Sequence, residues 1–87
     1  MMWIRSQDKK TLAYCTRLFV YGPYIQNLPA TGIEDDYDIM GKYESEKRAK
    51  EVLDEIEKQL LKCAELQEQI NDHQEIKKYL IFQMPEE

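Results

Sequence analysis

The segment from Ser45 to about Asn71 constrains the fold more than any other stretch, because it is the only strongly periodic part of the chain. When successive residues are placed 100° apart, its apolar side chains gather on one side of a helix. We therefore predict a long amphipathic helix that packs one face against the rest of the protein. Ser45 suits the N-cap position, because its hydroxyl can accept a hydrogen bond from a free amide of the first turn. The predicted apolar stripe consists of Ala49, Val52, Leu53, Ile56, Leu60, Cys63, Ala64 and Ile70.

Five shorter runs outside this segment have the apolar, aromatic and β-branched composition of strands. The first two are joined by only a few residues, so we expect them to pair in an antiparallel fashion. The fold class is therefore α+β: an antiparallel sheet of four or five strands with one long amphipathic helix packed across it, in a single domain over residues 1–87. The predicted strands cover residues 2–7, 11–21, 24–28, 37–43 and 78–84, with 24–28 as a short edge strand.

Alternation along the predicted strands assigns their side chains to two faces. In the first strand Met2, Ile4 and Ser6 share one face, and the residues between them share the other. Within residues 11–21, the even-numbered positions are predicted to face the core. Gly41, inside the fourth strand, predicts a bulge or a close approach of another group. The even-numbered residues predicted to face the core are Leu12, Tyr14, Leu18 and Val20.

Charge is distributed unevenly along the chain. The net charge is −5, with +3 in residues 1–33 and −8 in residues 34–87. An acidic majority argues against non-specific binding to duplex nucleic acid, where phosphate contacts dominate affinity. It fits a soluble protein that meets a basic surface, or one that keeps a small basic region for an anionic ligand.

The remaining composition points to a cytoplasmic protein. No apolar run approaches the ~20 residues that a membrane span needs, and no signal peptide precedes the first predicted strand. Cys15 and Cys63 are isolated, without a C-x-x-C pair. We therefore expect both thiols to be reduced and at or near the core.

Residues suited to catalysis or metal binding are sparse. His73 is the only histidine, and its place near the end of the predicted helix favours a capping or surface role. The acidic residues between positions 34 and 38 lack the spaced ligands and the turn glycine of a calcium loop. The chain has no P-loop, Rossmann fingerprint or zinc-ligand spacing. We therefore expect a protein without enzymatic activity, cofactor or metal.

An aromatic and basic cluster in the first 33 residues predicts a ligand-binding surface. Aromatic planes stack on bases and arginine forks match phosphates, so a small nucleotide is one ligand for such a face. The alternative is that these aromatic side chains fill the core or a dimer interface. Nucleic-acid mimicry by the acidic helix surface is less favoured, because basic residues interrupt that surface. The predicted ligand-binding residues are Trp3, Arg5, Arg17, Phe19 and Tyr21.

The length of the predicted helix suggests an oligomer. A helix over residues 45–71 would be about 40 Å long at 1.5 Å per residue, whereas an 87-residue domain is only about 30 Å across. Its last turns would overhang the sheet, and an overhanging apolar edge is normally covered. We expect a homo-oligomer joined through residues 60–72, unless the helix kinks near Cys63 and folds back as a hairpin. The predicted interface residues are Leu60, Cys63, Leu66, Gln67 and Ile70.

Two sequence motifs carry a resemblance. The opening MWIRSQD and the junction GKYESEKRA, which has the pattern G-x-Y-x-S-E-x-R-A, resemble short, mostly uncharacterised phage and prophage proteins of Gram-positive bacteria. The ending MPEE is similar as well, so the resemblance covers both ends and the helix start. It implies a phage-linked origin and a cytoplasmic setting in an infected host, and it supplies no catalytic residue.

These observations together predict a binding protein. The expected function is that of a non-enzymatic phage accessory protein that binds and inhibits a host component. Counter-defence by blocking a protein partner, through the acidic helix or residues 29–36, is the most specific version. The alternatives are capture of a small nucleotide signal on the aromatic-basic surface, and a structural or regulatory interaction module of the phage.

Overall fold

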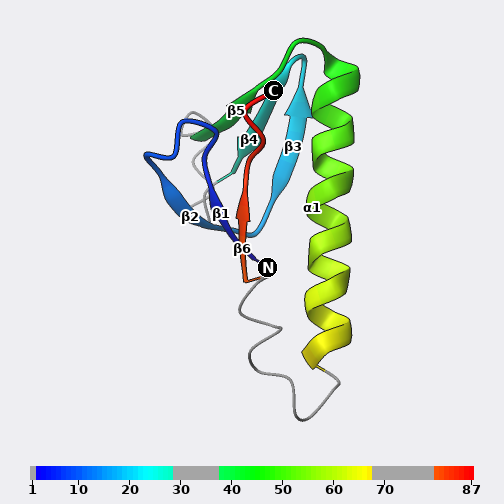
Figure 1. Ribbon diagram of the computed structural model, residues 1–87. Coiled ribbons are helices and arrows are strands. Elements are labelled where there is room, and N and C mark those ends of the chain that lie inside the picture. Colours follow the sequence, from blue (N-terminus) through cyan, green and yellow to red (C-terminus); the bar gives the residue numbers. More distant parts are fainter. Residues whose placement is uncertain (1, 29–37, 68–79) are drawn as a thin grey trace.

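Six short strands and one helix make up the part of the chain that the computed structural model describes, which comprises residues 2–28, 38–67 and 80–87 (Figure 1). The fold is α+β, as predicted. The elements are β1 (Met2–Arg5), β2 (Leu12–Cys15), β3 (Leu18–Tyr21), β4 (Tyr24–Asn27), β5 (Asp38–Lys42), α1 (Glu46–Gln67) and β6 (Ile81–Gln83).

The described strands form two three-stranded sheets, where one sheet of four or five strands was expected. The first sheet has the order β2-β1-β6 and the second has the order β3-β4-β5. The predicted antiparallel pairing of the first two strands is confirmed between β1 and β2. However, β6 pairs with β1 in parallel, so the first sheet is mixed. The predicted edge strand at 24–28 is instead the central strand of the second sheet, β4.

The predicted strand over residues 11–21 is divided in two at Thr16 and Arg17. Cys15, at an odd position in β2, is fully buried, whereas Leu18 and Val20, at even positions in β3, pack against the core. Side chains alternate with a period of two, so one straight strand cannot place odd and even positions on the same face. The chain therefore leaves the first sheet after Cys15 and enters the second sheet at Leu18.

Because the strand is divided, the core face predicted for residues 11–21 is wrong in β2. Leu12 and Tyr14 were expected to be buried, but both are exposed on β2. Met2, Ile4 and Ser6 are buried, as the alternation along β1 predicted.

Helix α1 begins as predicted but covers less of the fold than expected. The hydroxyl of Ser45 accepts a hydrogen bond from the amide of Arg48 at 3.1 Å, which confirms the N-cap. The helix packs against β3 and β4 rather than across a whole sheet, and in Figure 1 it runs alongside β3. Residues 68–71 of the predicted helix lie outside the described residues.

The apolar stripe of α1 is confirmed over most of its length. Ala49, Val52 and Ile56 are buried, while Leu53 and Leu60 are partly buried against the same core. Two positions differ from the prediction, because Ala64 is exposed and Leu66 is buried.

Gly41 marks both a bulge and a close approach. Ile25 pairs with Gly41 and Gln26 pairs with Ile39, so Met40 is an extra residue on β5, and its side chain is buried. A Cβ atom at position 41 would lie 2.9 Å from the Cε2 atom of the Tyr43 ring. Glycine therefore lets the Tyr43 ring pack over the β5 backbone.

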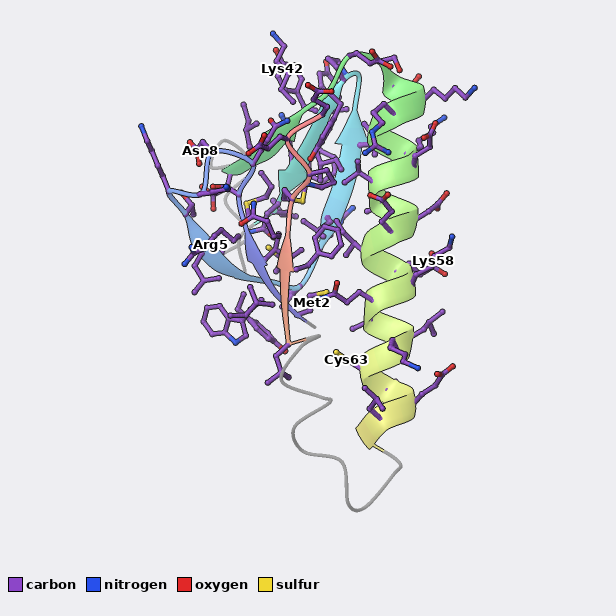
Figure 2. The ribbon with its side chains drawn as sticks, in the orientation of Figure 1. Met2, Arg5, Asp8, Lys42, Lys58 and Cys63 are labelled. Atoms are coloured by element: carbon purple, nitrogen blue, oxygen red, sulfur yellow. The ribbon has the colours of Figure 1, made fainter. Side chains whose placement is uncertain are left out.

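One core joins the two sheets and the helix. Figure 2 shows Met2 on the side of β1 toward α1 and Arg5 on the opposite side. The core cluster consists of Met2, Ile4, Cys15, Ile25, Met40, Tyr43, Ala49, Val52, Ile56, Phe82 and Met84.

Candidate functional site

The first sheet turns one face to the core and the other to solvent. Its strand register places side chains of the solvent side in two rows that cross all three strands. One row is Tyr14, Trp3 and Ile81, and the parallel row is Leu12, Arg5 and Gln83. We call these six residues the outer face, and all six are exposed.

The first row is aromatic and apolar. Trp3, on the central strand, is 45% exposed, while Tyr14 is 51% exposed and Ile81 is 50% exposed. The Trp3 and Tyr14 ring centroids are 5.4 Å apart with the planes at 64°, an edge-to-face contact. Such pairs are favourable in themselves, so each ring helps to hold the other in place while both remain accessible.

The second row brings one positive charge into this surface. Arg5 is exposed on the central strand, and it forms no ion pair with any carboxylate in the described part of the chain. Its neighbour Gln83 is already engaged, since its side-chain amide donates to the carbonyl oxygens of Ser6 and Met84, each at 3.0 Å. Arg5 is therefore a charged group of the outer face that has no ion-pair partner among the described residues.

An apolar groove continues the outer face toward the second half of α1. Its volume is about 370 Å³, and Trp3 and Tyr14 belong to both surfaces. Leu61 of the helix and Leu80, just before β6, are exposed at this groove. The described residues that line it are Met2, Trp3, Tyr14, Leu60, Leu61, Cys63, Ala64 and Leu80.

A second hollow, of about 440 Å³, lies where the last residues meet the start of α1. Three side chains donate to successive main-chain carbonyl oxygens: Tyr43 to Pro85 at 3.0 Å, Gln7 to Glu86 at 2.8 Å, and Arg48 to Glu87 at 2.8 Å. Burial raises the pKa of the Tyr43 hydroxyl to about 12, which keeps it protonated as a donor. Tyr43 and Arg48, which line this hollow, hold the last residues of the chain in place, so we assign the hollow a structural role.

The five predicted ligand-binding residues do not share one sheet. Trp3 and Arg5 lie together on the outer face, whereas Phe19 and Tyr21 belong to β3 of the second sheet. Arg17 is exposed in the link between the two sheets. Tyr21 is 70% exposed and Phe19 is partly buried.

Sequence reasoning missed four residues of the outer face. Leu12 and Tyr14 are predicted to face the core only if residues 11–21 form one continuous strand, and they do not. The core-facing positions change from odd to even between Cys15 and Leu18. This change is the signal that would have placed Leu12 and Tyr14 on the solvent side. Ile81 and Gln83 join the surface only through the parallel pairing of β6 with β1, which strand composition does not indicate.

Of the predicted oligomer residues, Leu60 and Cys63 line the groove, and the homo-oligomer stays a prediction. Cys63 and Leu66 are buried within a single copy of the chain, and Leu60 is partly buried. The side chain of Gln67 and the whole of Ile70 lie outside the described residues.

The two thiols are poor nucleophiles where they lie. Cys15 is fully buried, and its burial raises the pKa of the thiol to about 11, with Asp38 contributing in the same direction. Burial also raises the pKa of the Cys63 thiol. Both groups are therefore protonated at neutral pH, and the thiolate is the reactive form of cysteine.

Residues 2–28, 38–67 and 80–87 include no group of three or more histidine, cysteine, aspartate or glutamate side chains placed to hold a metal ion. His73 and the acidic residues at 34–36 lie outside this description. The described helix is also not long and apolar enough to cross a membrane.

Comparisons of the chain with protein-family models, with curated proteins and with solved structures gave no match.

Proposed function

We propose that this chain is a protein-binding module whose outer face docks on a partner protein and blocks it. The observation that carries the proposal is the composition of the two exposed rows on β2, β1 and β6. Tryptophan, tyrosine and arginine are the residues that contribute most often to the hot spots of protein interfaces. Here one of each lies within a single six-residue surface, with Trp3 at its centre.

The fold itself makes little use of these side chains. The core lies on the other side of β1, where Met2 and Ile4 are buried. Exposed aromatic and aliphatic side chains gathered in one place are typical of interaction sites. They project from a hydrogen-bonded sheet, so a partner would meet a surface that loses little conformational freedom on binding.

In this proposal the protein acts by obstruction and needs no catalytic group. The resemblance to phage and prophage proteins of Gram-positive bacteria supports a non-enzymatic accessory protein that inhibits a host component in the cytoplasm, with counter-defence as its most specific form. A structural or regulatory module of the phage would use the same docking surface.

A nucleotide ligand is the second candidate, and one observation favours it. Trp3 and Arg5 are two residues apart on the same face of β1, so a base could stack on the indole while the guanidinium meets a phosphate. Calorimetry with a panel of linear and cyclic nucleotides separates the two functions. Heat of binding that is lost in the Arg5→Ala variant would favour nucleotide capture. The absence of binding heat with every nucleotide would favour protein binding.

A site-specific photo-crosslinking experiment tests the protein-binding function. Tyr14 and Tyr21 are both exposed tyrosines, but they belong to different sheets, so they form a matched pair. Each is replaced in turn by the photoreactive benzoylphenylalanine in the full chain, expressed in Gram-positive host cells. We expect the photoreactive residue at position 14 to give a discrete adduct with another protein. The same adduct should be absent when the photoreactive residue is at position 21, and it should be lost from position 14 when the Trp3→Ser substitution is added. Identical adducts at both positions would overturn the proposal.

A further inference from the structure

We propose that the docking element of the partner is an amphipathic α-helix that lies across β2, β1 and β6 and places a carboxylate on Arg5. This inference rests on the proposed function, because it names the kind of partner that the outer face fits. It follows from the spacing of the two rows, from the charge of Arg5 in the second row and from the burial of the apolar stripe of α1.

The spacing of the first row matches one side of a helix. Neighbouring strands are about 4.8 Å apart, so Tyr14, Trp3 and Ile81 project at steps of that size across the sheet. Apolar residues at positions i, i+4 and i+7 of a helix advance by about 5.3 Å per step on average. A helix that crosses the strands can therefore seat three apolar side chains against the three members of this row.

The position of Arg5 in the second row determines where the negative charge of the partner helix must lie. Arg5 is two residues beyond Trp3 on the same strand, which is about 7 Å. This offset is comparable to the radius of a helix with its side chains, about 5–6 Å. A carboxylate on the flank of the seated helix would thus reach the guanidinium, which binds carboxylates with two parallel hydrogen bonds.

The nearest carboxylate in the sequence is already engaged in the turn between β1 and β2. Asp8 accepts hydrogen bonds from the Ser6 hydroxyl at 2.5 Å and from the amide of Lys10 at 3.0 Å. These bonds lower the pKa of the Asp8 carboxyl, with the bond from Ser6 contributing most. Asp8 therefore stays bound within its own turn, and Arg5 has no ion pair with any carboxylate of residues 2–28, 38–67 and 80–87.

The occupant is a helix of another protein rather than α1 of a second copy. The apolar stripe of α1 faces its own core, where Ala49, Val52 and Ile56 are buried. Leu61 is the large apolar side chain that α1 leaves exposed in its described residues. Within its described residues, Glu46–Gln67, α1 of a second copy therefore offers no row of three exposed apolar side chains to the outer face.

Trp3 is the only tryptophan of the chain and lies at the centre of the proposed surface, so its fluorescence reports binding. The probe is a stapled helical peptide with leucine at i, i+4 and i+7 and a glutamate on the flank that would face Arg5. The control peptide carries lysine in place of that glutamate. We expect the acidic peptide to shift the Trp3 emission to shorter wavelength and to bind about tenfold more tightly than the basic peptide. In Arg5→Glu the order of the two affinities should reverse.

Two isoleucines provide the matched control. Ile81 belongs to the outer face, whereas Ile39 is similarly exposed on β5 of the second sheet. Ile81→Ser should weaken binding of the acidic peptide about tenfold or more, because it removes an aliphatic side chain that the peptide would bury. Ile39→Ser should leave the affinity of that peptide unchanged. Equal affinities for the two peptides, no emission shift, or equal effects of both substitutions would each overturn the helix inference. If one of these results is obtained while the photo-crosslinking experiment still gives a specific adduct at position 14, the helix inference fails and the protein-binding function is retained.

Discussion

At the scale of single residues, burial controls the chemistry of Cys15. The thiol has no solvent access, and it lies among apolar residues contributed by both sheets. Burial stabilises the neutral thiol over the thiolate, which is why its pKa is raised to about 11. The alternation over residues 11–21 put odd positions such as Cys15 on the solvent side, and it failed because the strand breaks between Cys15 and Leu18.

The raised pKa predicts a loss of stability in alkaline solution. Between about pH 9 and 11 the unfolded chain has lost the Cys15 proton while the folded chain retains it. The folded state then binds more protons, so the free energy of unfolding falls as pH rises through this range, by about 1–2 kcal/mol. Urea unfolding at pH 8 and pH 10.5 measures this change.

Cys15→Ala is the control for this pH effect. The substitution lowers stability at both pH values because it leaves a small cavity, but it should reduce the difference between them. The residual difference belongs to other groups, including Tyr43, whose pKa is about 12. An unchanged pH dependence in Cys15→Ala would contradict the assignment to this thiol.

At the scale of elements, patterns close in sequence predicted the helix start, the faces of β1 and the antiparallel pairing of β1 with β2. The start of α1 follows from Ser45 and the apolar stripe, both of which are local in sequence. The faces of β1 follow from simple alternation. By contrast, the parallel contact of β6 with β1 joins residues almost eighty positions apart, and no local pattern encodes it.

The helix start gives a prediction at this scale. Ser45→Ala removes the acceptor for the Arg48 amide, so we expect the free energy of unfolding to fall by about 1 kcal/mol. Ser45→Asp keeps an acceptor and adds a negative charge at the positive end of the helix, so it should retain the parent stability. Thermal unfolding of the three proteins measures both effects, and a loss as large in Ser45→Asp as in Ser45→Ala would argue against capping.

At the scale of the whole molecule, the outer face arises from the division of the fold into two sheets. A single continuous strand over residues 11–21 would have turned Tyr14 inward, whereas the break at Thr16 and Arg17 leaves it beside Trp3. The sequence indicated Trp3 and Arg5 as binding residues, but it could not show that Tyr14 and Ile81 flank them. The candidate site is thus a product of strand pairing across the entire chain.

The central claim is that the partner docks on the outer face, and nuclear magnetic resonance tests it most directly. The partner identified by the adduct at position 14 is added to the isotope-labelled full chain. We predict shifts of the Trp3 indole and of the Ile81 methyl signals, with the Ile39 methyl signals unmoved as an internal reference. Shifts at Ile39 or along the solvent side of α1, without any change at Trp3 and Ile81, would contradict the account.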